Sequence, residues 1–171
     1  MIDTALRAAA KCVLAAFRAR GLTIATAESC TGGLVAAALT EIAGSSDVVD
    51  RGFVTYSNAA KEAMLGVPAV MLTHHGAVSG ETAAAMAAGA LKNSQADVAV
   101  AITGIAGPGG GSKQKPVGLV YFAAASRDGR YIARTRRYGK IGRRRVRERS
   151  VAEALELLQL VAEDARPAKA K

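Results

Sequence analysis

A cluster of small side chains, Ser29, Cys30 and Thr31, stands where a short apolar run gives way to a helical pattern. Residues 22–27 have the composition of a buried strand, and residues 34–42 repeat their apolar positions with helical spacing. At such a corner the unpaired N–H groups of the helix N-terminus favour an anion, either a bound phosphate or a developing oxyanion. Chemistry at Ser29 is one interpretation. The other is that Ser29 or Thr31 only caps the helix, with Gly32 and Gly33 forming a tight turn.

A lysine follows the next expected strand, which covers residues 51–57 and ends around Tyr56. Asn58 is expected to cap a short helix over residues 59–65, with Lys61 in its first turn. A cation at that position opposes the helix dipole. Lys61 is therefore either a solvated side chain held there at a slight cost or a functional group held next to Ser29.

A glycine-rich run over residues 104–112 is the second feature with chemical content. It follows a buried-type strand, residues 98–103, that ends at Thr103. Successive glycines allow several N–H groups to turn toward one anion. The run has neither the order of a Walker A loop nor that of a dinucleotide-binding G-x-G-x-x-G turn, so a flexible connection between strands is the alternative. Its candidate binding residues are Gly104, Gly107, Gly109 and Gly110.

Metal and disulfide chemistry are not expected. The two cysteines, Cys12 and Cys30, lack C-x-x-C spacing, which favours a reducing compartment. The only histidines, His74 and His75, are adjacent and have no partner at metal-ligand spacing. No apolar segment is long enough to cross a membrane, and residues 1–20 carry charges where a signal peptide would be apolar. A cytoplasmic protein without membrane contact is expected.

The formal net charge of +9 is concentrated in one segment. Residues 134–149 hold nine basic residues and one acidic residue, whereas the rest of the chain has 14 basic and 13 acidic residues. Nucleic-acid binding through this segment is possible only as a secondary property, because aromatic residues are few nearby and no helix-turn-helix or zinc-finger spacing is present. A solvated basic face, or a site for a small phosphorylated ligand, agrees at least as well with the pattern.

The remaining pattern predicts an α/β fold with a mixed parallel and antiparallel sheet covered by helices on both faces. Helices are expected over residues 3–20, 80–93 and about 144–164, with Asp3 and Ser79 as N-caps of the first two. An Asp-Gly turn predicts a hairpin between strands 118–126 and 131–138, and residues 70–78 are expected to form a loop or irregular strand. A single domain over residues 1–165 and a disordered tail over 166–171 are expected. The apolar fraction of 50% favours a homo-oligomer, such as a dimer.

Several collinear motifs together resemble the CinA C-terminal domain family, over roughly residues 5–162. The runs around Ser29 and Gly104 are the most specific. The matching segments are AESCTGG at 27–33, VTYSNAAKE at 54–62, LGVP at 65–68, HGAVS at 75–79, TGIAGPGGGS at 103–112 and KPVG at 115–118.

This resemblance implies a single three-layer α/β/α domain. Enzymatic members of the family hydrolyse the carboxamide of nicotinamide mononucleotide to nicotinate mononucleotide and ammonia, using a serine and a lysine. The positions that match are Ser29 and Lys61 for this pair, with Tyr56 and Thr103 in the neighbouring motifs. The larger amino-terminal domain of some members has no counterpart here, so its pyrophosphatase activity is not expected.

The residue types suit amide hydrolysis through a covalent intermediate. Ser29 would attack the carboxamide carbon, Lys61 would act as the general base and Tyr56 would relay or orient the proton. The N–H groups of residues 30–33 (Cys30, Thr31, Gly32 and Gly33) are candidates for the oxyanion hole. The nucleotide phosphate would lie against the glycine-rich run and the basic start of the last helix. No metal or organic cofactor is required.

The family usually has Gly-Asp-Arg before its last helix. Here Gly142-Arg143 stands in place of Asp-Arg, so the aspartate is absent, and Arg143 and Arg144 are both candidates for the site arginine. Two other interpretations stay open. The domain could bind a nucleotide without reacting with it, or Cys30 could be the nucleophile, since a thiol at a helix N-terminus can have a lowered pKa.

Overall fold

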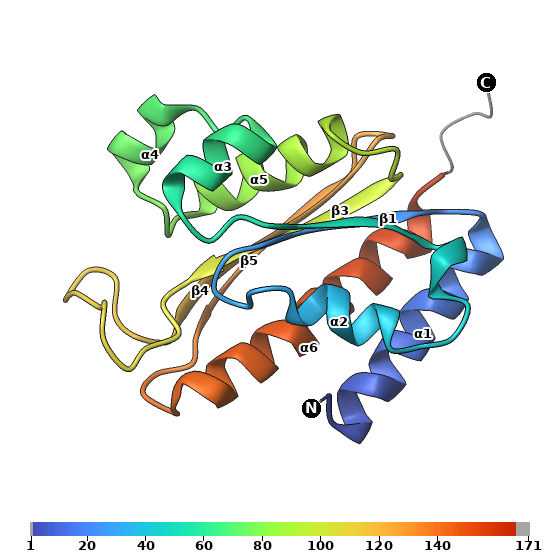
Figure 1. Ribbon diagram of the computed structural model, residues 1–171, viewed down its shortest axis with the longest axis horizontal. Helices are drawn as coiled ribbons and strands as arrows, with labels where there is room; N and C mark the ends of the chain where they lie inside the picture. The colour runs from blue at the N-terminus through green and yellow to red at the C-terminus, as the bar shows by residue number, and fades with distance from the viewer. Residues whose placement is uncertain (1, 167–171) are drawn as a thin grey trace.

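The sheet at the centre of the molecule has five strands in the order β2-β1-β3-β4-β5. The computed structural model describes residues 2–166 (Figure 1). β1 pairs in parallel with β2 and β3, whereas β3–β4 and β4–β5 are antiparallel. The predicted mixed sheet is therefore confirmed. Its strands are β1 (Ile24–Glu28), β2 (Val49–Val54), β3 (Val98–Gly104), β4 (Leu119–Ser126) and β5 (Tyr131–Arg137).

Helices cover both faces of this sheet, which confirms the three-layer α/β/α architecture (Figure 1). One layer contains α1 (Thr4–Arg20), α2 (Leu34–Thr40) and α6 (Arg143–Asp164). The other contains α3 (Asn58–Leu65), α4 (Ala69–His75) and α5 (Gly80–Lys92). A short 3₁₀ turn, η1 (Ser45–Asp47), precedes β2. None of the helices in the described range is long and apolar enough to cross a membrane.

The two faces of the central strands carry side chains of different size. Alternation along β3 directs Val98, Val100 and Ile102 toward the layer of α1 and α6, and Ala99 and Ala101 toward α5. All five are fully buried. The small alanine face therefore accommodates the alanine-rich α5, while the larger side chains fill the core on the other side.

Local helix signals are confirmed at two of the predicted caps. The Asp3 side chain accepts from the Leu6 N–H at 2.8 Å, and the Ser79 side chain accepts from the Thr82 N–H at 3.1 Å. The cap of α3 is one residue earlier than predicted, because Ser57 accepts from the Ala60 N–H at 3.1 Å and Asn58 is already helical.

Two other predictions about elements were wrong. Residues 70–78 were expected in a loop or irregular strand, but residues 70–75 belong to α4, which begins at Ala69 directly after Pro68. A proline suits a helix start because it lacks the N–H that the first turn leaves unpaired. β2 ends at Val54, two residues before Tyr56, which therefore lies in the connection to α3. The tail predicted over 166–171 lies, from residue 167 on, outside the described residues.

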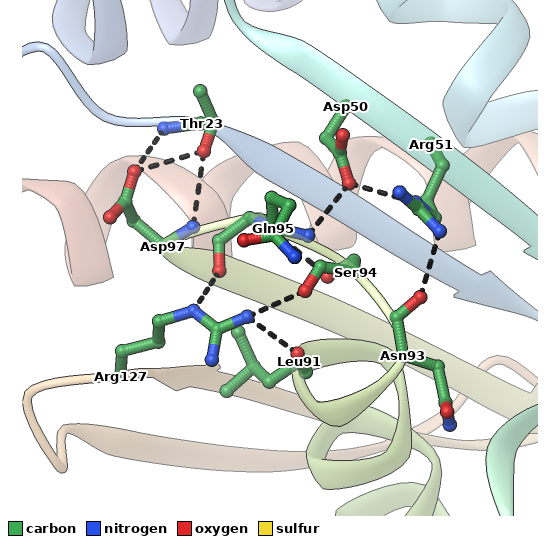
Figure 2. A network of polar contacts seen from close by, with 10 residues as sticks. Thr23, Asp50, Arg51, Leu91, Asn93, Ser94, Gln95, Asp97 and Arg127 are labelled. Atoms are coloured by element: carbon green, nitrogen blue, oxygen red, sulfur yellow. Dashed lines mark hydrogen bonds and ion pairs between the residues drawn. The ribbon is translucent and has the colours of Figure 1, made fainter. Parts of the chain in front are cut away.

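A polar network secures the end of the sheet where β1 and β3 begin (Figure 2). The guanidinium group of Arg127 donates to three backbone carbonyls, those of Leu91, Ser94 and Ala96, at 2.6–2.7 Å. The Asp97 carboxylate accepts from both the N–H and the hydroxyl of Thr23 at 2.9 Å. Ser29 follows the opposite end of β1, so this network lies away from the candidate site.

Candidate active site

Ser29 and Lys61 come together at the carboxyl end of β1. The Lys61 Nζ donates to the Ser29 Oγ at 3.2 Å and to the Thr55 carbonyl at 2.9 Å. Ser29 directly follows β1 and is held by its own N–H, which donates to the Ile102 carbonyl of β3 at 3.0 Å. Lys61 extends from α3 and is only 1% exposed. Of the two interpretations of Lys61, the structure therefore excludes the solvated side chain.

The environment of Lys61 favours its neutral form. Burial lowers the pKa of its ammonium group below the ordinary value, although the nearby Cys30 thiol acts in the opposite direction. Within the described part of the chain no carboxylate forms an ion pair with Lys61. A neutral amine within hydrogen-bond distance of a serine hydroxyl can accept its proton.

The chain after Ser29 forms a tight turn that needs glycine. The Gly32 N–H donates to the Ser29 carbonyl at 3.1 Å, and Gly32 and Gly33 have φ values of +59° and +91°. The Gly33 N–H donates to the Glu28 carboxylate at 3.0 Å. The N–H groups of Gly32 and Gly33 are thus engaged, whereas no carbonyl or carboxylate of the described residues accepts from those of Cys30 and Thr31.

Glu28 is a functional candidate that the sequence analysis missed. Its side chain is fully buried and accepts from the N–H groups of Gly33, Val35 and Ala36 at 2.9–3.0 Å. The carboxylate therefore caps α2, and neither Ser29 nor Thr31 does so. An acidic residue that ends an otherwise apolar strand was the available signal, because a buried carboxylate needs donors.

Cys30 is poorly suited to be the nucleophile. Burial raises the pKa of its thiol to about 12, outweighing its own backbone N–H, which lowers it. The thiolate, which is the reactive form, is therefore disfavoured at neutral pH.

Tyr56 and Arg143 link three segments around the corner. The Tyr56 side chain is exposed, and its hydroxyl accepts from Arg143 Nη2 at 2.9 Å. Arg143 Nη1 donates to the Gly107 carbonyl at 3.1 Å. No hydrogen bond joins Tyr56 to Ser29 or Lys61 in the described structure. Arg144 instead pairs with Glu148 at 2.7 Å and is exposed, so the geometry favours Arg143 as the site arginine.

The start of the glycine-rich run is shaped by packing. Thr103 is buried and donates through Oγ1 to the Ala77 carbonyl at 2.6 Å. A Cβ at Gly104 would lie 2.8 Å from the Leu119 carbonyl oxygen, and one at Gly107 would lie 2.6 Å from Val117. These two glycines permit close approach of the next strand segment. Gly109 has open space around it, and Gly110 has a φ of +83°.

Arg147, one turn after Arg143 on α6, also contacts the corner. Its Nη2 donates to the Thr31 carbonyl at 2.8 Å. In the sequence, Arg147 stands out only as one of the nine basic residues of the segment 134–149. Arg143 and Arg147 both line a cavity of about 780 Å³ between the starts of α1, α2 and α6. Neither Ser29 nor Lys61 lines it; the lining residues are Ile2, Leu6, Leu34, Arg143, Arg144, Arg147, Glu148 and Val151.

Three of the nine basic residues of the segment form ion pairs with acidic residues of α6 among the described residues. Arg134 and Arg136 of β5 both bond to Glu153 at 2.7–3.0 Å, and Arg134 also bonds to Glu156 at 2.8 Å. Arg144 pairs with Glu148 on the same helix. These pairs reduce the free charge available to an external polyanion. Among residues 2–166, no group of three or more His, Cys, Asp or Glu side chains could hold a metal ion.

Comparisons with known proteins identify the family and support the overall fold. The family model of the CinA C-terminal domain matches residues 6–162. The chain is 51% identical over 158 residues to the nicotinamide-nucleotide amidohydrolase PncC of Escherichia coli strain K12, covering 92% of this chain and 95% of that protein. It is also similar to the crystal structure of the competence/damage inducible protein CihA from Agrobacterium tumefaciens. That likeness has a TM-score of 0.93 and 54% identity, and covers 96% of this chain and 99% of the other. The chain belongs to the CinA C-terminal domain family.

Proposed function

We propose that the protein hydrolyses the carboxamide of nicotinamide mononucleotide, with Ser29 as nucleophile and Lys61 as general base. The observation that carries the proposal is the buried contact of 3.2 Å between Lys61 Nζ and Ser29 Oγ. The similarity to the E. coli amidohydrolase supports the substrate. The products are nicotinate mononucleotide and ammonia.

In the first half of the reaction, the Ser29 hydroxyl passes its proton to Lys61 while Oγ bonds to the carboxamide carbon. The tetrahedral intermediate then collapses. Its carbon–nitrogen bond breaks, and the leaving nitrogen takes the proton from Lys61 to depart as ammonia. A nicotinoyl ester of Ser29 remains.

In the second half, water attacks the ester carbon and passes a proton to Lys61. The carbon–oxygen bond to Ser29 breaks, Oγ regains the proton, and nicotinate mononucleotide leaves. Both tetrahedral intermediates carry a negative oxygen. We assign its stabilisation to the N–H groups of Cys30 and Thr31, because those of Gly32 and Gly33 are already engaged.

We assign the nucleotide phosphate to the start of α6, beside the glycine-rich run. Arg143 donates to the Gly107 carbonyl, so its charge lies next to this run. Arg143 and Arg144 both line the cavity at the start of α6. Gly109 and Gly110 are the glycines of the run that lie clear of close packing against residues 117–120. Tyr56 positions Arg143 instead of relaying the proton, because its hydroxyl contacts that guanidinium group. A cytoplasmic location is part of the proposal, since both cysteines are free thiols.

The test measures release of ammonia and nicotinate mononucleotide from nicotinamide mononucleotide, with a chelator present. Ser29→Ala and Lys61→Ala are each expected to lower kcat by about 10³-fold or more. Ser46→Ala and Lys11→Ala, at exposed positions outside the site, are the matched controls and should keep wild-type turnover. Absence of turnover in the wild type, with nucleotide binding retained in calorimetry, would instead identify a binding module without catalysis.

A further inference from the structure

Arg147 connects to the nucleophile corner through two peptide groups in series. Its Nη2 donates to the Thr31 carbonyl at 2.8 Å. The same peptide group carries the Gly32 N–H, which donates to the Ser29 carbonyl at 3.1 Å. The Ser29 carbonyl in turn shares its peptide group with the Cys30 N–H. A continuous chain of donors and acceptors thus runs from the guanidinium group to an N–H beside the Ser29 hydroxyl.

Hydrogen bonds in series polarise one another, and the effect is larger where water is excluded. Thr31 is fully buried, and Cys30 and Ser29 are 6% and 9% exposed. The arginine guanidinium group is a permanent cation under ordinary conditions. Its charge draws electron density along the two peptide groups, which makes the N–H at the far end a stronger donor.

We propose that Arg147 is a positioning residue that strengthens and orients the Cys30 N–H as a donor to the oxyanion. This inference rests on the proposed function, because it assumes that negative charge develops at Ser29. Arg147 itself touches neither the nucleophile nor the general base, and acts through the backbone of the turn.

The neighbouring arginines of α6 do not share this arrangement. Arg144 is neutralised by Glu148, and Arg143 faces Tyr56 and Gly107. Arg147 forms no ion pair with a carboxylate in the described part of the chain. The charge of Glu28 opposes that of Arg147 at the corner, where it raises the pKa of the Cys30 thiol. The field of Arg147 reaches the corner: although burial raises the pKa of Cys30, the charge of Arg147 acts to lower it.

The first experiment compares kcat and KM for nicotinamide mononucleotide in the wild type, Arg147→Met, Arg147→Lys and Arg145→Met. Arg145 is exposed on the same helix and serves as the matched control. Arg147→Met is expected to lower kcat by about 10- to 100-fold with little change in KM, since an oxyanion donor is weakened and not removed. Arg147→Lys should recover part of kcat. An unchanged kcat, or a rise in KM alone, would overturn the proposal, the latter by showing that Arg147 binds the substrate.

Chemical rescue distinguishes two causes of a lowered kcat, which are loss of the Arg147 charge and loss of folding. Guanidinium ion at millimolar concentration should raise kcat of Arg147→Ala, while sodium chloride at the same concentration should not. Equal effects of the two salts would contradict a specific role of the guanidinium group. Thermal unfolding measured on the same samples shows whether the variant is folded during the assay.

A readout that does not need the natural substrate distinguishes failure of this inference from failure of the proposed function. Sulfonyl fluorides modify an activated serine through a step that also develops negative charge on an oxygen. The rate of Ser29 modification, followed by mass spectrometry, should fall in Arg147→Met and stay at the wild-type value in Arg145→Met. Equal rates in the wild type and Arg147→Met, or no reaction in either, would overturn the inference whether or not nicotinamide mononucleotide is hydrolysed.

Discussion

Lys61 Nζ lies 3.2 Å from Ser29 Oγ, although 32 residues separate the two in the chain. The contact forms because β1 and β2 are parallel neighbours, so the segments that follow them meet at one edge of the sheet. Both backbone groups of Thr55 stabilise this contact. Its N–H donates to the Glu28 carbonyl at 2.8 Å, and its own carbonyl accepts from Lys61. The sheet therefore brings together the two residues that we propose as nucleophile and general base.

The pH dependence of turnover should report the titration of Lys61. Only the neutral amine can take the serine proton, and burial lowers the pKa of Lys61 from its ordinary value of 10.5. We expect kcat/KM to rise with pH through a single ionisation that lies below 10.5. A profile that stays flat down to the range where carboxylates titrate would contradict this assignment.

The same burial should make stability depend on pH. The folded chain holds the Lys61 proton less tightly than the unfolded chain, so the free energy of unfolding rises with pH between the lowered pKa and 10.5. Lys61→Met removes this dependence. The free energy of unfolding of Lys61→Met should exceed that of the wild type at low pH. This difference should decrease as pH rises, by about 1.4 kcal/mol for each unit by which the pKa of Lys61 is lowered. Urea unfolding at several pH values measures it, with exposed Lys11→Met as control. A difference that is constant with pH would argue that Lys61 is charged in the folded protein.

Cys30 should resist alkylation in the folded protein. Its thiol is buried with a pKa raised to about 12, whereas Cys12 is exposed on α1. Iodoacetamide at mildly alkaline pH should therefore label Cys12 first, as followed by peptide mass spectrometry. In urea the two cysteines should react at similar rates. Rapid labelling of Cys30 in the native protein, in step with loss of turnover, would instead support a thiolate nucleophile.

The elements that sequence could predict depend on local chemistry. Asp3 and Ser79 were identified as N-caps because a cap side chain bonds a backbone N–H only a few residues away. The turn at Gly129, with a φ of +93°, was evident from Asp-Gly for the same reason. The expected homo-oligomer stays a prediction, since the structure contains a single chain.

The parts of the site that sequence could not predict depend on contacts between distant segments. Arg147 and Thr31 are 116 residues apart, and no sequence pattern near either residue predicts the contact. Glu28 was missed because its donors appear only when the start of α2 folds back over the end of β1. Arg143 and Arg144 were equivalent on the helical pattern, and their separate partners, Gly107 and Glu148, distinguish them.

Glu28→Gln should weaken both the fold and turnover. The carboxylate accepts three backbone N–H groups at the start of α2, and an amide offers one oxygen and places N–H groups against those donors. We expect the free energy of unfolding to fall by about 2 kcal/mol, and kcat to fall because the Ser29–Gly33 turn loses its anchor. Urea unfolding and turnover measured together test this. Glu41→Gln, at the exposed end of α2, is the control, and equal effects of the two substitutions would refute the role given to Glu28.

Arg127→Met should lower stability without altering the chemistry. Arg127 donates to the carbonyls of Leu91, Ser94 and Ala96, which close the end of α5 and the turn into β3 (Figure 2). Loss of these charged hydrogen bonds should reduce the free energy of unfolding by about 2 to 4 kcal/mol. The network lies where β1 and β3 begin, whereas Ser29 follows the opposite end of β1, so kcat and KM at a temperature below the unfolding transition should stay at wild-type values. Exposed Arg7→Met controls for loss of one positive charge. A fall in kcat for the folded Arg127 variant would show instead that the two ends of the sheet are coupled.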